Sequence, residues 1–168
     1  NNIILCTKNG MCIKFAETDV RSMGRGASGV TGMKLSDGDY VIGGSVCKDD
    51  ESKVLVVTEN GYGKKTDLSE YKIQNRGGHG IFTYKITEKT GKLAGVATVC
   101  DDDDMMFITS EGVIIRTHTA EISTFGRQTQ GVRIMRLDDD VKLVSSAKTP
   151  HEEEEISEET NNENIEKE

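Results

Sequence analysis

The chain has no tryptophan, a single proline and no run of about 20 apolar residues of the kind that a membrane-spanning helix requires. We therefore expect no membrane partner. It begins with Asn1 rather than Met and shows no signal peptide, so we expect a piece cut from a longer cytoplasmic protein. Glycine, in contrast, occurs 18 times. Abundant glycine without abundant proline favours many tight turns and hence many short strands.

The cysteines show no metal-binding or disulfide pattern. The four of them, Cys6, Cys12, Cys47 and Cys100, form no C-x-x-C pair and have no histidine at zinc spacing. All lie in apolar, strand-like runs, so we expect buried free thiols and no metal site.

The net charge of -8 belongs to one end of the chain. Residues 150–168 contain nine acidic residues and one lysine, whereas residues 1–149 contain equal numbers of acidic and basic residues. The sequence therefore predicts a neutral domain over 1–149 followed by a disordered acidic tail over 150–168.

A repeat of 51 residues runs through the neutral part. Glycines in polar turns recur at Gly10, Gly61 and Gly112, and each lies 51 residues after the previous one. A second set keeps the same spacing at Gly29, Gly80 and Gly131, and the threonines Thr7, Thr58 and Thr109 do so as well. The repeats span about 3–53, 54–104 and 105–149.

Each repeat is predicted to form four strands. The first strands are expected at 3–6, 54–57 and 105–108, the second at 11–15, 62–66 and 113–117, the third at 30–35, 81–86 and 132–137, and the fourth at 41–47, 93–99 and 141–147. Asn9-Gly10 and Asn60-Gly61 are predicted two-residue hairpin turns. Segments 17–22, 68–73 and 119–124 could each make one short helical turn. Four strands in a repeat of this length indicate all-β, propeller-like blades, and three blades make only a partial ring.

Basic residues recur with the blades. Lys14, Lys65 and Arg116 share one offset, Arg25, Arg76 and Arg127 a second, and Lys34, Lys85 and Arg136 a third. Strand alternation is expected to turn these side chains away from the core, which would form a basic stripe for the phosphates of bent duplex DNA. The alternative is a strand face that carries Lys and Arg only for solubility. Aromatic residues are few, which favours duplex over single-stranded nucleic acid. The candidate DNA-binding residues are Lys14, Arg21, Arg25, Lys34, Lys64, Lys65, Lys72, Arg76, Lys85, Arg116, Arg127, Arg133 and Arg136.

One segment resembles a family signature. Gln74-Asn75-Arg76-Gly77-Gly78-His79-Gly80 is similar to the box Gln-Arg-Arg-Gly-Gly-Lys-Gly of the C-terminal domains of bacterial DNA gyrase A, and it departs from that box at Asn75 and His79. The flanking stretches 59–66, 20–25, 119–123 and 126–132 resemble the late blades of the same family. The likeness covers about 3–149.

The resemblance implies the last three blades of a six-bladed β-pinwheel. Because the family's box lies in the first blade, residues 74–80 would be a degenerate copy in the fifth. The implied function is to bind and bend duplex DNA around the rim, so that gyrase can introduce negative supercoils with ATP, and the acidic tail would modulate this wrapping. The implied partners are the rest of gyrase A and the gyrase B protein in an A2B2 complex in the bacterial cytoplasm. Alternatives are the topoisomerase IV counterpart and a protein-binding propeller scaffold.

Catalytic chemistry is not expected in this chain. The tyrosines are explained as strand or core residues, and His79, His118 and His151 are scattered along the sequence. The acidic run Asp101–Asp104 is better explained as a solvated turn than as a divalent metal site. The glycine-rich segments lack the Lys-Ser/Thr ending of a phosphate loop, so no cofactor is expected here, and ATP and Mg would act elsewhere in the holoenzyme.

Overall fold

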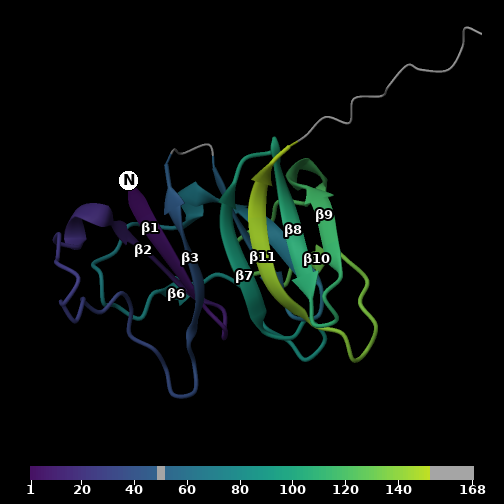
Figure 1. Ribbon diagram of the computed structural model, residues 1–168, viewed down its shortest axis with the longest axis horizontal. Coiled ribbons are helices and arrows are strands. Elements are labelled where there is room, and N and C mark those ends of the chain that lie inside the picture. The colour runs from purple at the N-terminus through teal and green to yellow at the C-terminus, as the bar shows by residue number, and fades with distance from the viewer. Residues whose placement is uncertain (49–51, 152–168) are drawn as a thin grey trace, which may run out of the picture.

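Three antiparallel sheets stand side by side like blades (Figure 1). The computed structural model describes residues 1–48 and 52–151. Its strands are β1 (Asn2–Thr7), β2 (Met11–Ala16), β3 (Val41–Cys47), β4 (Lys53–Thr58), β5 (Tyr62–Asp67), β6 (Ile81–Phe82), β7 (Leu93–Val99), β8 (Asp103–Thr109), β9 (Ile114–His118), β10 (Val132–Arg133) and β11 (Leu143–Pro150). The expected short helical turns are 3-10 turns at Glu17–Asp19, Leu68–Glu70 and Thr119–Glu121. The all-β, propeller-like prediction is confirmed.

The hairpin turns differ from the prediction. Gly10 and Gly61 adopt φ of 87° and 81°, but every positive φ in the described residues belongs to a glycine, so Asn9 and Asn60 do not adopt one. The amide of Gly10 donates to the carbonyl of Thr7 at 3.1 Å. This places the glycine after a turn rather than inside a two-residue turn, as in hairpins that end in a left-handed bulge residue.

Each later repeat contributes one strand to the sheet of the repeat before it. The first sheet has the order β3-β1-β2-β6 and the second β10-β5-β4-β7, so β6 and β10 pair with the blade before their own. Phe82 lies opposite Met11, and Val132 lies opposite Gly63. The third strand was predicted at 30–35, 81–86 and 132–137, but only two residues of each later segment form a strand and 30–35 forms none. The third sheet, β11-β8-β9, receives no strand from another repeat and has three strands. Each of the first two blades is completed by a strand of the next repeat, which links the blades by hydrogen bonds as well as through the chain.

Both faces of the central blade are buried. Val54 and Val56 of β4 pack toward the first blade with Ile4, whereas Leu55 and Val57 pack toward the third blade with Phe107. Strands β3, β7 and β11 lie side by side across the blade boundaries (Figure 1). Because successive side chains of a strand point to opposite faces, stacking buries both sets and leaves the blade edges for polar residues.

The thiols are not all buried. Cys6, Cys12 and Cys47 are buried free cysteines, as predicted, but Cys100 is exposed because it lies in the turn before β8. Within residues 1–48 and 52–151, no helix is long and apolar enough to cross a membrane. The predicted acidic tail lies outside the described residues except for Pro150 and His151.

Candidate nucleic-acid interface

Two members of the first set of repeated basic residues, Lys14 and Lys65, lie between the blades rather than on the surface. Lys14 is 8% exposed and Lys65 2%. The Lys14 ammonium donates to the carbonyl of Leu68 at 3.2 Å, and Lys65 donates to the carbonyl of Thr119 at 2.7 Å. The acceptors are themselves 51 residues apart, so the same contact fastens each blade to the 3-10 turn of the next. The prediction that these side chains face outward is wrong for Lys14 and Lys65, because stacking buries both faces of the strand. The third member of the set, Arg116, is exposed.

Lys64 is also buried, with no exposed surface. Its ammonium donates to the carbonyls of Gly126 and Arg127, both at 2.6 Å, and to the hydroxyl of Thr129 at 3.2 Å. Burial lowers the pKa of Lys64 to about 8, although the nearby Glu70 carboxylate acts in the opposite direction. Lys64 therefore ties the second blade to a loop of the third and is not available to bind DNA.

The second set is divided. Arg25 is exposed, but Arg76 and Arg127 are half-buried. The Arg76 guanidinium donates to the carbonyls of Asp19 and Thr31, at 3.1 and 2.5 Å, and Arg127 makes the equivalent bond to the carbonyl of Phe82. These three arginines therefore do not form one exposed row, because two of them are committed to carbonyls of the preceding repeat.

The third set is exposed on every repeat. Met33, Tyr84 and Met135 are buried, while the next residue in each segment faces solvent. The exposed cations of this third set are Lys34, Lys85 and Arg136. Backbone contacts repeat there too, because the amides of Lys34 and Lys85 donate to the carbonyls of Gly78 and Thr129 at 2.8 and 3.1 Å. The alternation of apolar and basic residues in these segments correctly predicted that the basic side chains face solvent. Their apolar neighbours pack against the blades, so the opposite side of each segment stays exposed.

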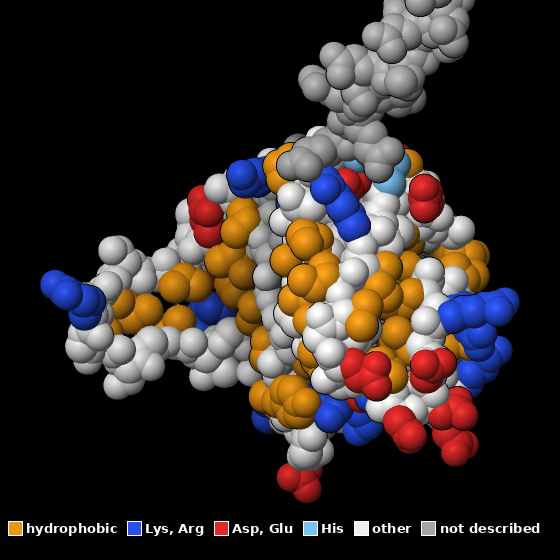
Figure 2. All heavy atoms as spheres, turned by 45° about the vertical axis from the view of Figure 1, so that its right-hand side comes forward, with side chains coloured by type: hydrophobic (Ala, Val, Ile, Leu, Met, Phe, Trp, Pro, Cys, Tyr) orange, Lys and Arg blue, Asp and Glu red, His pale blue; other side chains and the backbone are white. Residues whose placement is uncertain are grey.

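Other candidates share this exposure. The remaining exposed candidates are Arg21, Arg25, Lys72 and Arg133. Arg116 is 40% exposed, but its Nε donates to the Asp104 carboxylate at 2.7 Å. Figure 2 shows one group of Lys and Arg side chains at the right of the view, beside a group of Asp and Glu, and further basic side chains at other places on this face. Apart from Arg116, seven candidates are exposed across the three repeats, and we refer to them as the exposed cationic edge: Arg21, Arg25, Lys34, Lys72, Lys85, Arg133 and Arg136.

Equivalent hollows occur along this edge. One of about 630 Å³ is lined by Tyr62, Lys89, residues 130–135 and Arg136. Another of about 550 Å³ is lined by six residues, of which Phe82, Tyr84 and Lys85 are the counterparts in the preceding repeat of Arg133, Met135 and Arg136. In the larger hollow, Arg133 lies 5.4 Å and Lys89 5.6 Å from the centre of the Tyr62 ring. Lys89 was not predicted, because it has no basic counterpart 51 residues away.

Three stretches of the chain match the family model described as DNA gyrase C-terminal domain, beta-propeller, at residues 1–48, 52–100 and 103–150. The chain belongs to the DNA gyrase C-terminal domain family. It is 45% identical to the DNA gyrase A protein of Staphylococcus epidermidis over 90% of its own length, and it spans 17% of that protein. A solved DNA gyrase A C-terminal domain is similar at 32% identity with a TM-score of 0.82, over 88% of this chain and 50% of that one. A solved topoisomerase IV C-terminal domain is similar at 25% identity with a TM-score of 0.84, over 89% and 47%.

The segment that resembles the gyrase box packs against the preceding repeat. The amide of Gln74 donates to the carbonyl of Lys14 and that of Gly77 to the carbonyl of Gly32, both at 2.8 Å. Gly80 has φ of 77°, and a Cβ there would overlap the carbonyl oxygen of Cys12. Asn75 and His79 are exposed, whereas Gly78 is half-buried. In this chain of the gyrase C-terminal domain family, Gly80 is the glycine of the segment that allows two blades to approach closely.

A polar cluster at the end of the third sheet was missed by sequence reasoning. Asp104 is buried near the start of β8 and accepts hydrogen bonds from His118, His151 and Arg116. Burial raises the pKa of Asp104, but these three donors outweigh it and hold the pKa at about 2. Its neighbour Asp101 is paired with Lys65 at 2.5 Å and Lys53 at 3.3 Å, and hydrogen bonds from these lysines lower the Asp101 pKa. The acidic run is thus a set of inter-strand ion pairs rather than only a solvated turn.

Proposed function

We propose that this domain binds duplex DNA along the exposed cationic edge and bends it there, as part of a DNA gyrase A protein that acts with gyrase B in an A2B2 complex in the bacterial cytoplasm. The whole enzyme would introduce negative supercoils with ATP and Mg bound elsewhere. The observation that carries the proposal is the recurrence of exposed Lys34, Lys85 and Arg136 at one place on three successive repeats. Family membership supports the assignment to gyrase.

The division of the basic residues explains how the edge is held in shape. Lys14 and Lys65 fasten each blade to the next, and Arg76 and Arg127 hold the loops that precede the edge. A cation on an already ordered backbone meets a phosphate without the entropy cost of ordering a loop, whereas a cation on a loose loop carries that cost. Regular spacing on rigid blades also suits a stiff polyanion that must be bent, because specificity then depends on deformability rather than on base contacts.

The test measures the salt dependence of DNA binding by the intact gyrase A protein. In the triple variant Lys34→Gln, Lys85→Gln, Arg136→Gln, the slope of log affinity against log salt should become shallower by about 2 to 3, because each lost phosphate contact removes roughly 0.9. The matched control is Lys48→Gln, an exposed lysine at the end of β3 outside the edge. Equal slopes in the wild type and the triple variant would remove this edge from DNA binding.

Supercoiling of relaxed plasmid by the assembled enzyme distinguishes gyrase from the topoisomerase IV counterpart. The wild-type complex should introduce negative supercoils, and the triple variant should lose this activity while it retains relaxation that needs no wrapping. DNA binding that does not respond to salt would instead favour a protein-binding scaffold.

A further inference from the structure

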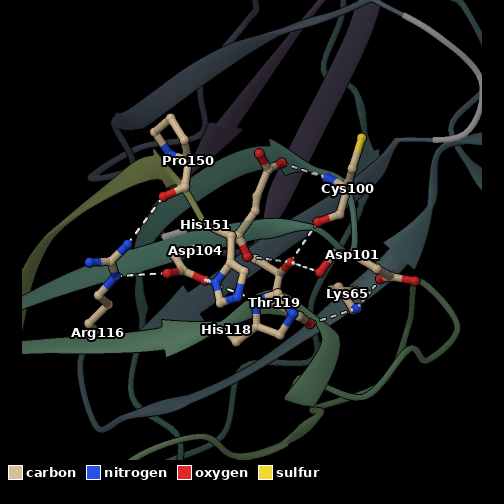
Figure 3. A network of polar contacts seen from close by, with 10 residues as sticks. Lys65, Cys100, Asp101, Asp104, Arg116, His118, Thr119, Pro150 and His151 are labelled. Carbon is tan, nitrogen blue, oxygen red and sulfur yellow. Dashed lines mark hydrogen bonds and ion pairs between the residues drawn. The ribbon is translucent and has the colours of Figure 1, made fainter. Parts of the chain in front are cut away.

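Three segments that are far apart in the sequence place metal-binding side chains at one point. Asp104 comes from β8, His118 ends β9, and His151 follows β11 directly (Figure 3). Nδ1 of His118 and Nδ1 of His151 each lie 2.9 Å from the same oxygen, Oδ1 of Asp104. The two imidazole rings lie 4.2 Å apart between centroids. Two histidines and a carboxylate therefore converge on one small volume.

The surroundings orient the carboxylate as a ligand. Arg116 Nε donates to the other oxygen, Oδ2, at 2.7 Å, and the same guanidinium donates to the carbonyl of Pro150 at 3.2 Å. The Asp104 side chain is 4% exposed, so its orientation is set by these contacts. A ligating carboxylate whose second oxygen is hydrogen-bonded is typical of protein metal sites. Oδ1 is thereby left facing both imidazoles.

The dimensions suit a small divalent cation with nitrogen and oxygen ligands. Candidate ligand atoms of the three residues all lie within 4.8 Å of one another. Zinc bonds to histidine nitrogen and carboxylate oxygen are roughly 2.0 to 2.2 Å long. In the tetrahedral geometry that zinc prefers, two such bonds hold their ligand atoms about 3.4 Å apart, so the 2.9 Å spacing found here has to open by about 0.5 Å when the cation binds. The histidine side chains are 29% and 39% exposed, so water has access for the remaining coordination positions.

We propose that Asp104, His118 and His151 form a binding site for a divalent zinc-like cation, which fastens the chain at residue 151 to the last sheet. Coordination through Nδ1 requires the neutral ring that carries its hydrogen on Nε2, so the Nδ1 hydrogens that face the carboxylate exchange through solvent as the cation enters, and each ring keeps one hydrogen on Nε2. Imidazole and carboxylate together favour zinc over calcium or magnesium, which prefer oxygen ligands alone. The acidic run that starts at Glu152 follows directly in the sequence. Cation binding thus fixes the position of His151, the residue directly before the acidic run.

Equilibrium dialysis of the intact, tag-free protein against Zn²⁺ tests the site. After treatment with a chelator, the wild type should bind one equivalent that is lost, or weakened about tenfold or more, in His118→Ala and in His151→Ala. His79→Ala removes the remaining histidine of the chain, which lies outside the cluster, and Cys100→Ser removes the nearby exposed thiol. Both controls should keep the equivalent. The same stoichiometry and affinity in all five proteins would overturn the proposal.

Two measurements on the wild type protect the test against misfolded variants. Substoichiometric Zn²⁺ should shift the imidazole resonances of His118 and His151 together and leave those of His79 in place. Amide hydrogen exchange in β11 should slow about tenfold or more with Zn²⁺, since the cation joins the end of this strand to β8 and β9. Unshifted resonances would refute the metal site, and unchanged exchange would refute the fastening of residue 151.

Discussion

Lys64, which is buried between the second and third blades, gives a prediction that stability measurements can test. Replacing Lys64 with Met removes an ammonium group that donates to the carbonyls of Gly126 and Arg127 and to the Thr129 hydroxyl. The equivalent residue of the first repeat is Ile13, so an apolar chain of similar length suits the strand. At pH 7 two effects oppose each other, because the variant loses three hydrogen bonds but no longer buries a charge. The informative quantity is therefore how the stability difference changes with pH.

The sign follows from the pKa. Burial lowers the pKa of Lys64 to about 8 in the folded protein, below the ordinary value of 10.5 that applies when the chain is unfolded. Between these values the unfolded chain binds the additional proton, so the free energy of unfolding rises with pH across this window. From pH 7 to pH 9.5 the free energy of unfolding of the wild type should rise by about 2 kcal/mol through the shifted pKa of Lys64. The Met variant lacks this titration, so the wild type should gain about 2 kcal/mol relative to it.

Urea unfolding followed by far-UV circular dichroism at four pH values between 7 and 9.5 measures the difference. Other titrating groups are common to both proteins and cancel. Lys85→Met, at an exposed lysine, serves as the control and should show a difference that does not vary with pH. A flat difference for Lys64→Met, or one that shrinks as pH rises, would refute the claim that a charged ammonium is buried at this blade boundary.

Three further outcomes are expected. Gly80→Ala should lower the free energy of unfolding by about 2 kcal/mol or more, because φ is 77° and the new Cβ would meet the Cys12 carbonyl. Gly24→Ala, at a glycine with open space around it, should change the free energy of unfolding by less than about 0.5 kcal/mol. Equal urea midpoints for the two variants would contradict this. Tyr71→Phe should lower the free energy of unfolding by about 1 kcal/mol, because the 2.6 Å hydrogen bond with Thr83 is lost. Burial raises the pKa of the Tyr71 phenol, so above pH 10 the unfolded chain loses the phenol proton first and the stability of the wild type falls with pH. The variant should show a smaller fall, and an unchanged alkaline slope would contradict the burial of the phenol. Replacing Glu152–Glu155 with Gln should tighten DNA binding by the intact gyrase A protein several-fold at low salt, if the acidic segment competes with DNA for the cationic edge, and unchanged binding would exclude that competition.

Much of the architecture could be predicted because it depends on local patterns that recur. The 51-residue spacing of Gly10, Gly61 and Gly112 predicted the hairpins of each blade, and alternation in the third segments predicted that Lys34, Lys85 and Arg136 face solvent. A period of two in a strand and a positive φ at glycine are properties of a few neighbouring residues, so they are visible without knowledge of the fold.

The tertiary structure decided which faces are covered. Alternation placed Lys14 and Lys65 opposite the apolar residues of their strand, and only stacking of the blades shows that this face is buried as well. Likewise, β6 and β10 pair with the preceding blade, and no pattern within one repeat could reveal this pairing between repeats. The cluster of Asp104, His118 and His151 depends on β9 and the end of β11 meeting at β8. Such contacts join residues that are distant in the sequence, so their chemistry emerges only when the chain is folded.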